Sequence, residues 1–298
     1  MLSHVANSNR KGKTAAVKSA VYDIYVRAHC ISACAAIADE SYTLSASTHE
    51  GRVRAYNEDN FTVNAILGLE EGVRRSLRAS GMAEPLMCAV FDGTGGETAG
   101  VAASRIAAEY ATWLYNSYKE NLHDRERLIT RYVSESSRYI VEKLSDYGGR
   151  RGASTFAMAV ISRGILYAYS LGDSRLYLFT EGRLYRISFD HTVAMDMFRE
   201  GIYTREQAQR SPDRHKLTAF LGIEPASAAK PERYEPIRLK KGDRLLLCTD
   251  GLYSMMNDGE LADVLMTDVP DKACALVDIA VARGAKDNVT CTVIECDE

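Results

Sequence analysis

Residues 155–187 read TFAMAVISRGILYAYSLGDSRLYLFTEGRLYRI, and this stretch decides the fold. It holds three short apolar runs with very short connections between them: Thr155–Ile161, Ile165–Leu171 and Arg175–Phe179. Such connections join antiparallel neighbours, because parallel strands need a long crossover. Glu181-Gly182 predicts a hairpin turn into one more strand, Arg183–Ile187. The sequence therefore predicts an antiparallel sheet here.

Further strands and amphipathic helices surround this stretch. Strands are predicted at 41–49, 60–67, 86–91, 234–239, 244–248 and 288–295, and helices at 97–118, 128–144, 192–209, 261–265 and 272–283. One-sided sheets and amphipathic helices must each bury a face. We therefore expect an α+β fold, a four-layer α-β-β-α sandwich with two central antiparallel sheets flanked by helices.

Composition excludes several classes of protein. The 298 residues are 46% hydrophobic and 26% charged, which is a globular mix. The formal net charge of −3 gives no basic excess of the kind that nucleic-acid binders carry. The sequence contains no run of about 18 apolar residues, so no membrane span is predicted. The seven scattered cysteines indicate reduced thiols and a cytoplasmic protein, rather than a disulfide framework or a zinc site.

Two regions are expected along the chain. Residues 1–38 form an N-terminal extension with a helix over about 16–38, and residues 39–298 form one domain. The apolar residues of the extension are expected to pack on the domain, and a regulatory or dimer role is the alternative. The oligomeric state stays open.

Acidic residues recur in five clusters, and these carry the chemistry. Asp92 and Asp250 each follow an apolar strand and precede a glycine, so the sheet places each carboxylate rigidly. The other clusters are Asn57-Glu58-Asp59, Gly172-Asp173-Ser174 and Asp287-Asn288. Each one alone is typical of an ordinary turn. Together they would repel one another unless cations neutralise them, and oxygen ligands favour Mg²⁺ or Mn²⁺.

In their order along the chain, these clusters resemble the protein phosphatase 2C family of metal-dependent Ser/Thr phosphatases. The resemblance covers about 41–294 and includes Gly152-Ala-Ser-Thr155, Asp190-His191-Thr192 and the segment Leu217–Gly222. The stretch Thr204-Arg-Glu-Gln-Ala208 is similar to the flap of bacterial members. The family fold, two antiparallel sheets between helical layers, agrees with the sandwich predicted above.

The resemblance also implies roles for individual residues. Asp92 would bridge two Mn²⁺ or Mg²⁺ ions, and the backbone carbonyl of Gly93 would bind one of them. Asp250 and Asp287 would complete the ligands of the other ion. Glu58 and Asp59 would hold metal-bound waters, with direct binding of the metal by Glu58 as the alternative. Asp173 with Asp250 would form a third, weaker site. Arg54 matches the arginine that grips the substrate phosphate with its planar fork of donors.

The implied reaction is hydrolysis of phosphoserine and phosphothreonine in phosphoproteins, the targets of a Ser/Thr kinase. Metal-activated water would attack phosphorus with no covalent phosphoenzyme. Thr94 stands where many eukaryotic members have a histidine as general acid, and threonine is a poor acid, so we hypothesise that a metal-bound water protonates the leaving group. His49, His191 and His215 are expected to be structural.

Two other functions compete with this one. A catalytically weak or silent relative could use the same fold as a regulatory binding protein, but such relatives usually lose a ligand, and Asp92, Asp250 and Asp287 are all present. A two-metal nuclease fits the carboxylates and does not fit the acidic charge balance. The sequence therefore favours an active phosphatase.

Overall fold

The computed structural model describes residues 41–68, 75–119, 124–146, 151–224 and 230–297. The extension 1–38 and its predicted helix lie outside the described residues. Within the described ranges, no helix has the length and apolar character that a membrane crossing requires. Within the same ranges, Cys88, Cys248 and Cys291 are buried free thiols.

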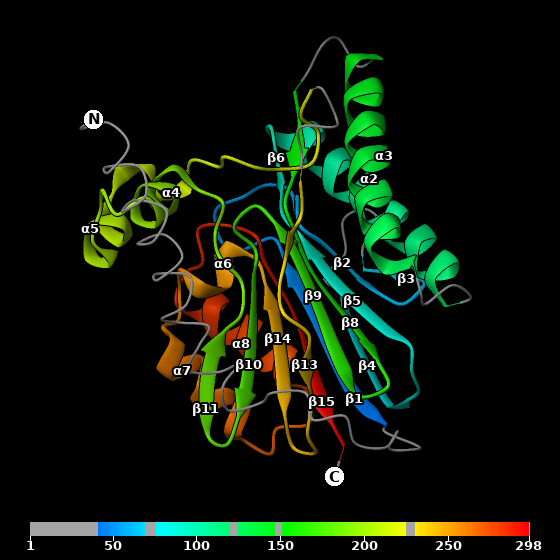
Figure 1. The fold of residues 1–298 in the computed structure, drawn as a ribbon. Coiled ribbons are helices and arrows are strands. Elements are labelled where there is room, and N and C mark those ends of the chain that lie inside the picture. Colours follow the sequence, from blue (N-terminus) through cyan, green and yellow to red (C-terminus); the bar gives the residue numbers. More distant parts are fainter. Residues whose placement is uncertain (1–40, 69–74, 120–123, 147–150, 225–229, 298) are drawn as a thin grey trace, which may run out of the picture.

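Two antiparallel sheets form the centre of the fold (Figure 1). The first has the strand order β11-β10-β14-β15-β1-β4. Its strands, in chain order, are β1 (Tyr42–His49), β4 (Arg75–Met82), β10 (Arg175–Thr180), β11 (Arg183–Arg186), β14 (Arg244–Cys248) and β15 (Val289–Cys296). The last strand of the chain therefore lies in the middle of this sheet, between β14 and β1.

The second sheet has the order β12-β9-β8-β5-β2-β3, and β13 also pairs with β9. Its strands are β2 (Asn60–Val63), β3 (Ile66–Leu67), β5 (Leu86–Phe91), β8 (Phe156–Ser162), β9 (Ile165–Leu171), β12 (Glu232–Arg233) and β13 (Ile237–Arg238). A short separate ladder joins β6 (Gly93–Thr94) to β7 (Ala153–Ser154) just beyond the end of β5. It fixes the chain directly after Asp92.

Three hydrophobic cores hold four layers together. Leu44, Val90 and Leu178 belong to the core between the two sheets. Helices α2 (Glu97–Tyr118) and α3 (Arg125–Asp146) cover the outer face of the second sheet (Figure 1). The outer face of the first sheet is covered by α6 (Asp250–Tyr253), α7 (Asp258–Met266) and α8 (Lys272–Ala282). The predicted α+β fold with four α-β-β-α layers is confirmed.

The single helix predicted over 192–209 is wrong, because the chain breaks there into shorter helices. These are α4 (Val193–Arg199), α5 (Arg205–Arg210) and the 3₁₀ helix η2 (Pro212–His215). Gly201 adopts φ 74° and turns the chain. Thr204 then begins α5 with a capping box. We call residues 193–216 the flap; it extends to one side of the sheets in Figure 1, and the Val193 amide donates to the Lys216 carbonyl at 2.9 Å to close it.

Two predicted strands differ from those in the structure, and the eight-residue strand β4 was not predicted. The strand expected over 60–67 is the hairpin β2–β3, because Asn64 turns the chain with φ 53°. Of the strand expected over 234–239, the structure forms only the short strand β13, and β12 lies just before the predicted range. Strand β4 (RSLRASGM) has only a short apolar alternation, at Leu77 and Ala79, and it pairs with β1 at the edge of the sheet.

Candidate metal and active site

Five aspartates converge at one end of the two sheets, where several strands begin or end. Asp92 follows β5, and Asp250 begins α6 directly after β14. Asp173 lies in the turn between β9 and β10, Asp59 precedes β2, and Asp287 precedes β15. The charges of Asp59, Asp250, Asp173 and Asp287 all act on the Asp92 carboxyl, so these distant parts of the sequence share one site. Their convergence is the arrangement that the sequence predicts.

Threonines hold two of these aspartates in place. The Thr155 amide donates to the Asp92 carbonyl at 2.8 Å, and the Asp92 amide donates to Thr155 Oγ1 at 3.2 Å. Thr249 Oγ1 donates to Asp59 Oδ2 at 2.8 Å, and Asp59 is only 2% exposed. The threonine beside Asp250 therefore fixes a carboxylate nearly two hundred residues away in the sequence.

Arg54 lies at the rim of the site. Its Nη2 donates to Asp287 Oδ2 at 2.8 Å, and its side chain is about half exposed. This bond with Asp287 is the main cause that raises the pKa of Arg54. The remaining donors of the guanidinium stay available to an anion approaching from solvent.

Glu58 lies beside the turn that follows Asp92. The Gly93 amide donates to the Glu58 carbonyl at 3.1 Å. The Glu58 carboxylate packs over Gly100, where its Oε2 would lie 2.4 Å from an added Cβ. A Cβ at Gly93 would lie 2.2 Å from the Gly100 carbonyl oxygen, so only glycine fits this close approach. Glu58 and Gly93 therefore lie side by side next to Asp92, and their roles in metal binding remain predictions.

Asn288 is a residue whose importance the sequence analysis missed. Its side-chain amide donates to the carbonyls of Glu50 at 2.8 Å and Tyr56 at 2.9 Å, and its Oδ1 accepts from the Glu58 amide at 2.8 Å. Asn288 therefore fixes the loop that carries Arg54 and Glu58 against the start of β15. Its place directly after Asp287 was the available signal, although an asparagine there is also typical of an ordinary turn.

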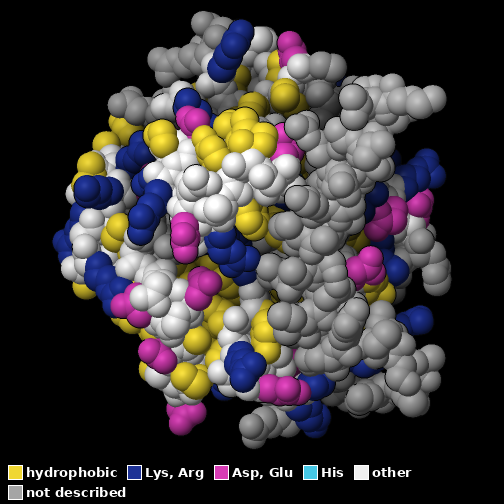
Figure 2. Space-filling view, turned by 60° about the vertical axis from the view of Figure 1, so that its left-hand side comes forward, with side chains coloured by type: hydrophobic (Ala, Val, Ile, Leu, Met, Phe, Trp, Pro, Cys, Tyr) yellow, Lys and Arg dark blue, Asp and Glu magenta, His cyan; other side chains and the backbone are white. Residues whose placement is uncertain are grey.

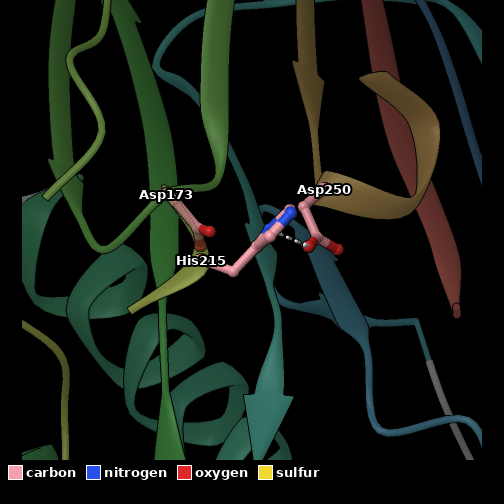
Figure 3. Close-up of side chains that lie close together, drawn as sticks. All are labelled: Asp173, His215 and Asp250. Atoms are coloured by element: carbon pink, nitrogen blue, oxygen red, sulfur yellow. Dashed lines mark ion pairs between the residues drawn. The ribbon is translucent and has the colours of Figure 1, made fainter. Parts of the chain in front are cut away.

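His215 was expected to be structural, yet the structure places it in the site. η2 brings it beside Asp173 and Asp250, and one ligand atom from each of the three residues lies within 4.8 Å of the others (Figure 3). His215 Nδ1 is 3.9 Å from Asp250 Oδ2. Burial, followed by the positive charges of Arg214 and Arg175, lowers the pKa of His215.

The side chains of the other two candidate histidines form hydrogen bonds with backbone groups. His49 Nδ1 accepts from the Gly51 amide at 2.9 Å. The buried His191 contacts Gly172 through Nδ1 at 3.0 Å. Thr94 is exposed in the β6–β7 ladder.

Burial and mutual repulsion make the negative charges in the site costly. Burial raises the pKa of Asp92 well above its usual value, and the neighbouring carboxylates add to the effect. The same two causes raise the pKa of Asp59 to about 8 and that of Asp250 to about 6. Burial is the main cause that raises the pKa of Asp173, and the negative charge of Asp250 is the second. A divalent cation would remove this repulsion, and carboxylate oxygens are the ligands that hard cations prefer, so the residues fit the metal site that the fold implies.

Comparison with known proteins agrees with this geometry. The family model described as "Protein phosphatase 2C" matches residues 77–282, which is more than half of the chain. The chain belongs to the protein phosphatase 2C family. The serine/threonine phosphatase Stp of Listeria welshimeri is 27% identical to this family member over 255 residues, covering 83% of this chain and 93% of Stp.

Solved structures share the fold of this phosphatase 2C family member. The serine/threonine phosphatase of S. agalactiae superposes with a TM-score of 0.72 at 22% identity, covering 86% of this chain and all of that one. The catalytic domain of the phosphatase PstP, solved with two manganese ions, superposes with a TM-score of 0.68 at 25% identity. That match covers 87% of this chain and 100% of the PstP chain.

Proposed function

We propose that this chain is a metal-dependent protein serine/threonine phosphatase that hydrolyses phosphoserine and phosphothreonine through water, with no covalent phosphoenzyme. The observation that carries the proposal is the convergence of five aspartates from distant parts of the chain at one site, where the other four charges act on Asp92. The serine/threonine phosphatase named for Listeria and the manganese-bound PstP structure support it. Retention of every expected acidic residue favours an enzyme over a silent binding relative.

The site residues have distinct proposed tasks. Asp92 would bridge two Mn²⁺ or Mg²⁺ ions, with the Gly93 carbonyl, Asp250 and Asp287 as further ligands. Glu58 and Asp59 would hold waters around them. When bound, two divalent cations lower the pKa of a water molecule and place positive charge beside the phosphoryl oxygens. A third, weaker site would use Asp173 and Asp250, and the position of His215 adds an imidazole nitrogen to that donor set.

The chain itself would bind and orient the phosphate. Arg54 keeps one Nη2 bond to Asp287 and can offer its other N–H groups to two phosphoryl oxygens. Asn288 and Thr249 hold the loop and the carboxylate that surround this position, so little reorganisation is needed when substrate binds. The expected partners are phosphoproteins made by a Ser/Thr kinase, and the expected location is the cytoplasm.

The proposal is tested by hydrolysis of a phosphothreonine peptide with and without Mn²⁺. We expect activity that requires Mn²⁺ and falls at least about 100-fold in Asp250→Asn, because loss of one ligand charge weakens the metal site. Circular dichroism of Asp250→Asn checks that the variant folds. Equal activity in EDTA and in Mn²⁺, or full activity of the folded variant, contradicts the proposal.

A further inference from the structure

A pocket of about 720 Å³ lies between the flap and the body of the domain, and the function proposed above assigns no task to it. Its walls come from α4, α5 and η2 on one side, and from β10, β11 and the start of α7 on the other. His215 lines this flap pocket, and its Nδ1 lies 3.9 Å from Asp250 Oδ2. The flap pocket therefore adjoins the acidic site.

Positive charge predominates in the flap pocket, although the whole chain has a net charge of −3. Its charged lining residues are four arginines and two aspartates: Arg175, Arg186, Arg205, Arg214, Asp190 and Asp258. Asp190 accepts from Arg175 at 2.8 and 3.1 Å and also pairs with Arg186. One buried carboxylate thus balances two guanidinium groups, which leaves a surplus of positive charge.

The two flap arginines add to this surplus. Arg214 Nη1 donates to the Ser211 carbonyl at 3.3 Å, and the Arg205 guanidinium lies 5.9 Å from the centre of the Phe198 ring. Neither of these partners carries a charge. In the described ranges, no ion pair joins a carboxylate to Arg205 or Arg214. Both side chains are exposed, so an incoming anion can reach them.

Apolar side chains complete the flap pocket. Met195, Phe198 and Met256 line it beside the arginines. The face turned forward in Figure 2 shows hydrophobic side chains lying among Lys, Arg, Asp and Glu side chains. An apolar lining accommodates the aliphatic part of a peptide side chain, and it strengthens ion pairs at its edge by excluding water. This combination suits a peptide with acidic side chains.

Because His215 lines the flap pocket and also lies beside Asp250, an acidic residue in this pocket must be close in sequence to the phosphorylated residue. An extended peptide spans about 3.3–3.6 Å per residue, so three residues cover about 10 Å. We infer that the flap pocket binds an aspartate or glutamate within about three residues of the phosphorylated residue, so that the enzyme selects phosphoprotein segments of acidic sequence. This inference rests on the proposed phosphatase function and names the class of its substrates.

The test compares phosphothreonine peptides that differ only in their flanking residues. The three positions on the N-terminal or on the C-terminal side hold Glu, Gln or Lys, and kcat/KM is measured in Mn²⁺. On the side of the phosphothreonine where Glu has the larger effect, we expect kcat/KM of the Glu peptide to be about ten times that of the Gln peptide. Raised salt should reduce this ratio. In the double variant R205Q/R214Q the ratio should fall to about one. Arg210→Gln, on the outer part of α5, is the matched control and should keep the wild-type ratio.

The outcomes separate this inference from the proposed function. Hydrolysis of all peptides with no preference for Glu, or a preference that survives R205Q/R214Q, overturns the inference and leaves the phosphatase intact. Absence of any hydrolysis overturns the phosphatase. In that case, fluorescence anisotropy with labelled Glu and Gln peptides decides on the flap pocket: tighter binding of the Glu peptide that R205Q/R214Q abolishes supports it, and equal binding refutes it.

Discussion

Replacement of Asp59 by asparagine is expected to stabilise the metal-free protein above neutral pH. Asp59 is 2% exposed, and burial is the main cause that raises its pKa from 3.8 to about 8. Because the folded-state pKa is above the unfolded value, the folded protein binds the extra proton. The stability that this proton on Asp59 contributes is fully present below about pH 4 and is lost as the pH rises through about 8.

The size of the effect follows from linkage. A carboxyl whose pKa rises from 3.8 to about 8 costs at most ~5 kcal/mol of stability at pH 8. Asp92 and Asp250 repel the same charge and share this cost, so we expect ~2–3 kcal/mol for Asp59→Asn. In a protein of this size, that corresponds to about 5 °C in melting temperature. Asparagine can still accept the Thr249 hydrogen bond, so the variant removes charge with little change of shape.

Thermal unfolding in EDTA between pH 5.5 and 9 measures this effect. The melting temperature of the wild type should fall with rising pH. The melting temperature of Asp59→Asn should fall less and should be higher than that of the wild type at pH 8. Asp263→Asn, on an exposed position of α7, is the control and should follow the wild type. Saturating Mn²⁺ should stabilise the wild type more than Asp59→Asn. A variant less stable than the wild type at pH 8 in EDTA refutes the reasoning.

Three further substitutions test separate parts of the site. Gly251→Ala should lower the free energy of unfolding in urea by at least ~3 kcal/mol, because its Cβ would lie 1.8 Å from the Asn288 carbonyl oxygen. The control Gly259→Ala, whose Cβ would lie 3.2 Å from Asn257 Oδ1, should lose less than ~1 kcal/mol. Equal losses in the two variants would contradict this explanation. Arg54→Lys should raise KM for a phosphopeptide about tenfold, because lysine loses the two-pronged contact; an unchanged KM would remove Arg54 from phosphate binding. Thr94→Ala should keep more than about a tenth of the activity, and a near-total loss with metal retained would make Thr94 essential.

The sequence predicted the layers and the acidic site because both depend on local patterns. The apolar runs before Asp92 and Asp250 mark strand ends, and the short connection after Ile161 imposes the antiparallel pairing of β8 with β9. The antiparallel pairing predicted across the turn after Leu171 is wrong, because that turn carries the chain from β9 in one sheet to β10 in the other. Strand β4 lacks such an apolar run and pairs with its neighbour β1 at the edge of the sheet. The break at Gly201 divides a segment whose composition is otherwise helical.

Residues that act through distant partners escaped the sequence analysis. Asn288 bonds to residues more than 200 positions earlier in the chain, and nothing local to it names them. His215 joins Asp173 and Asp250 only because the flap folds back toward the sheets. The extent of the N-terminal extension, 1–38, and the role of its helix remain predictions.

We propose that the converging carboxylates form a site for paired divalent cations. The most direct measurement is the number of Mn²⁺ ions bound per chain, by equilibrium dialysis with metal analysis, in the wild type and in Asp92→Asn. We expect at least two ions in the wild type and loss of the tightly bound pair in the folded variant. Binding of no ion by the wild type, or equal binding by the variant, would contradict it.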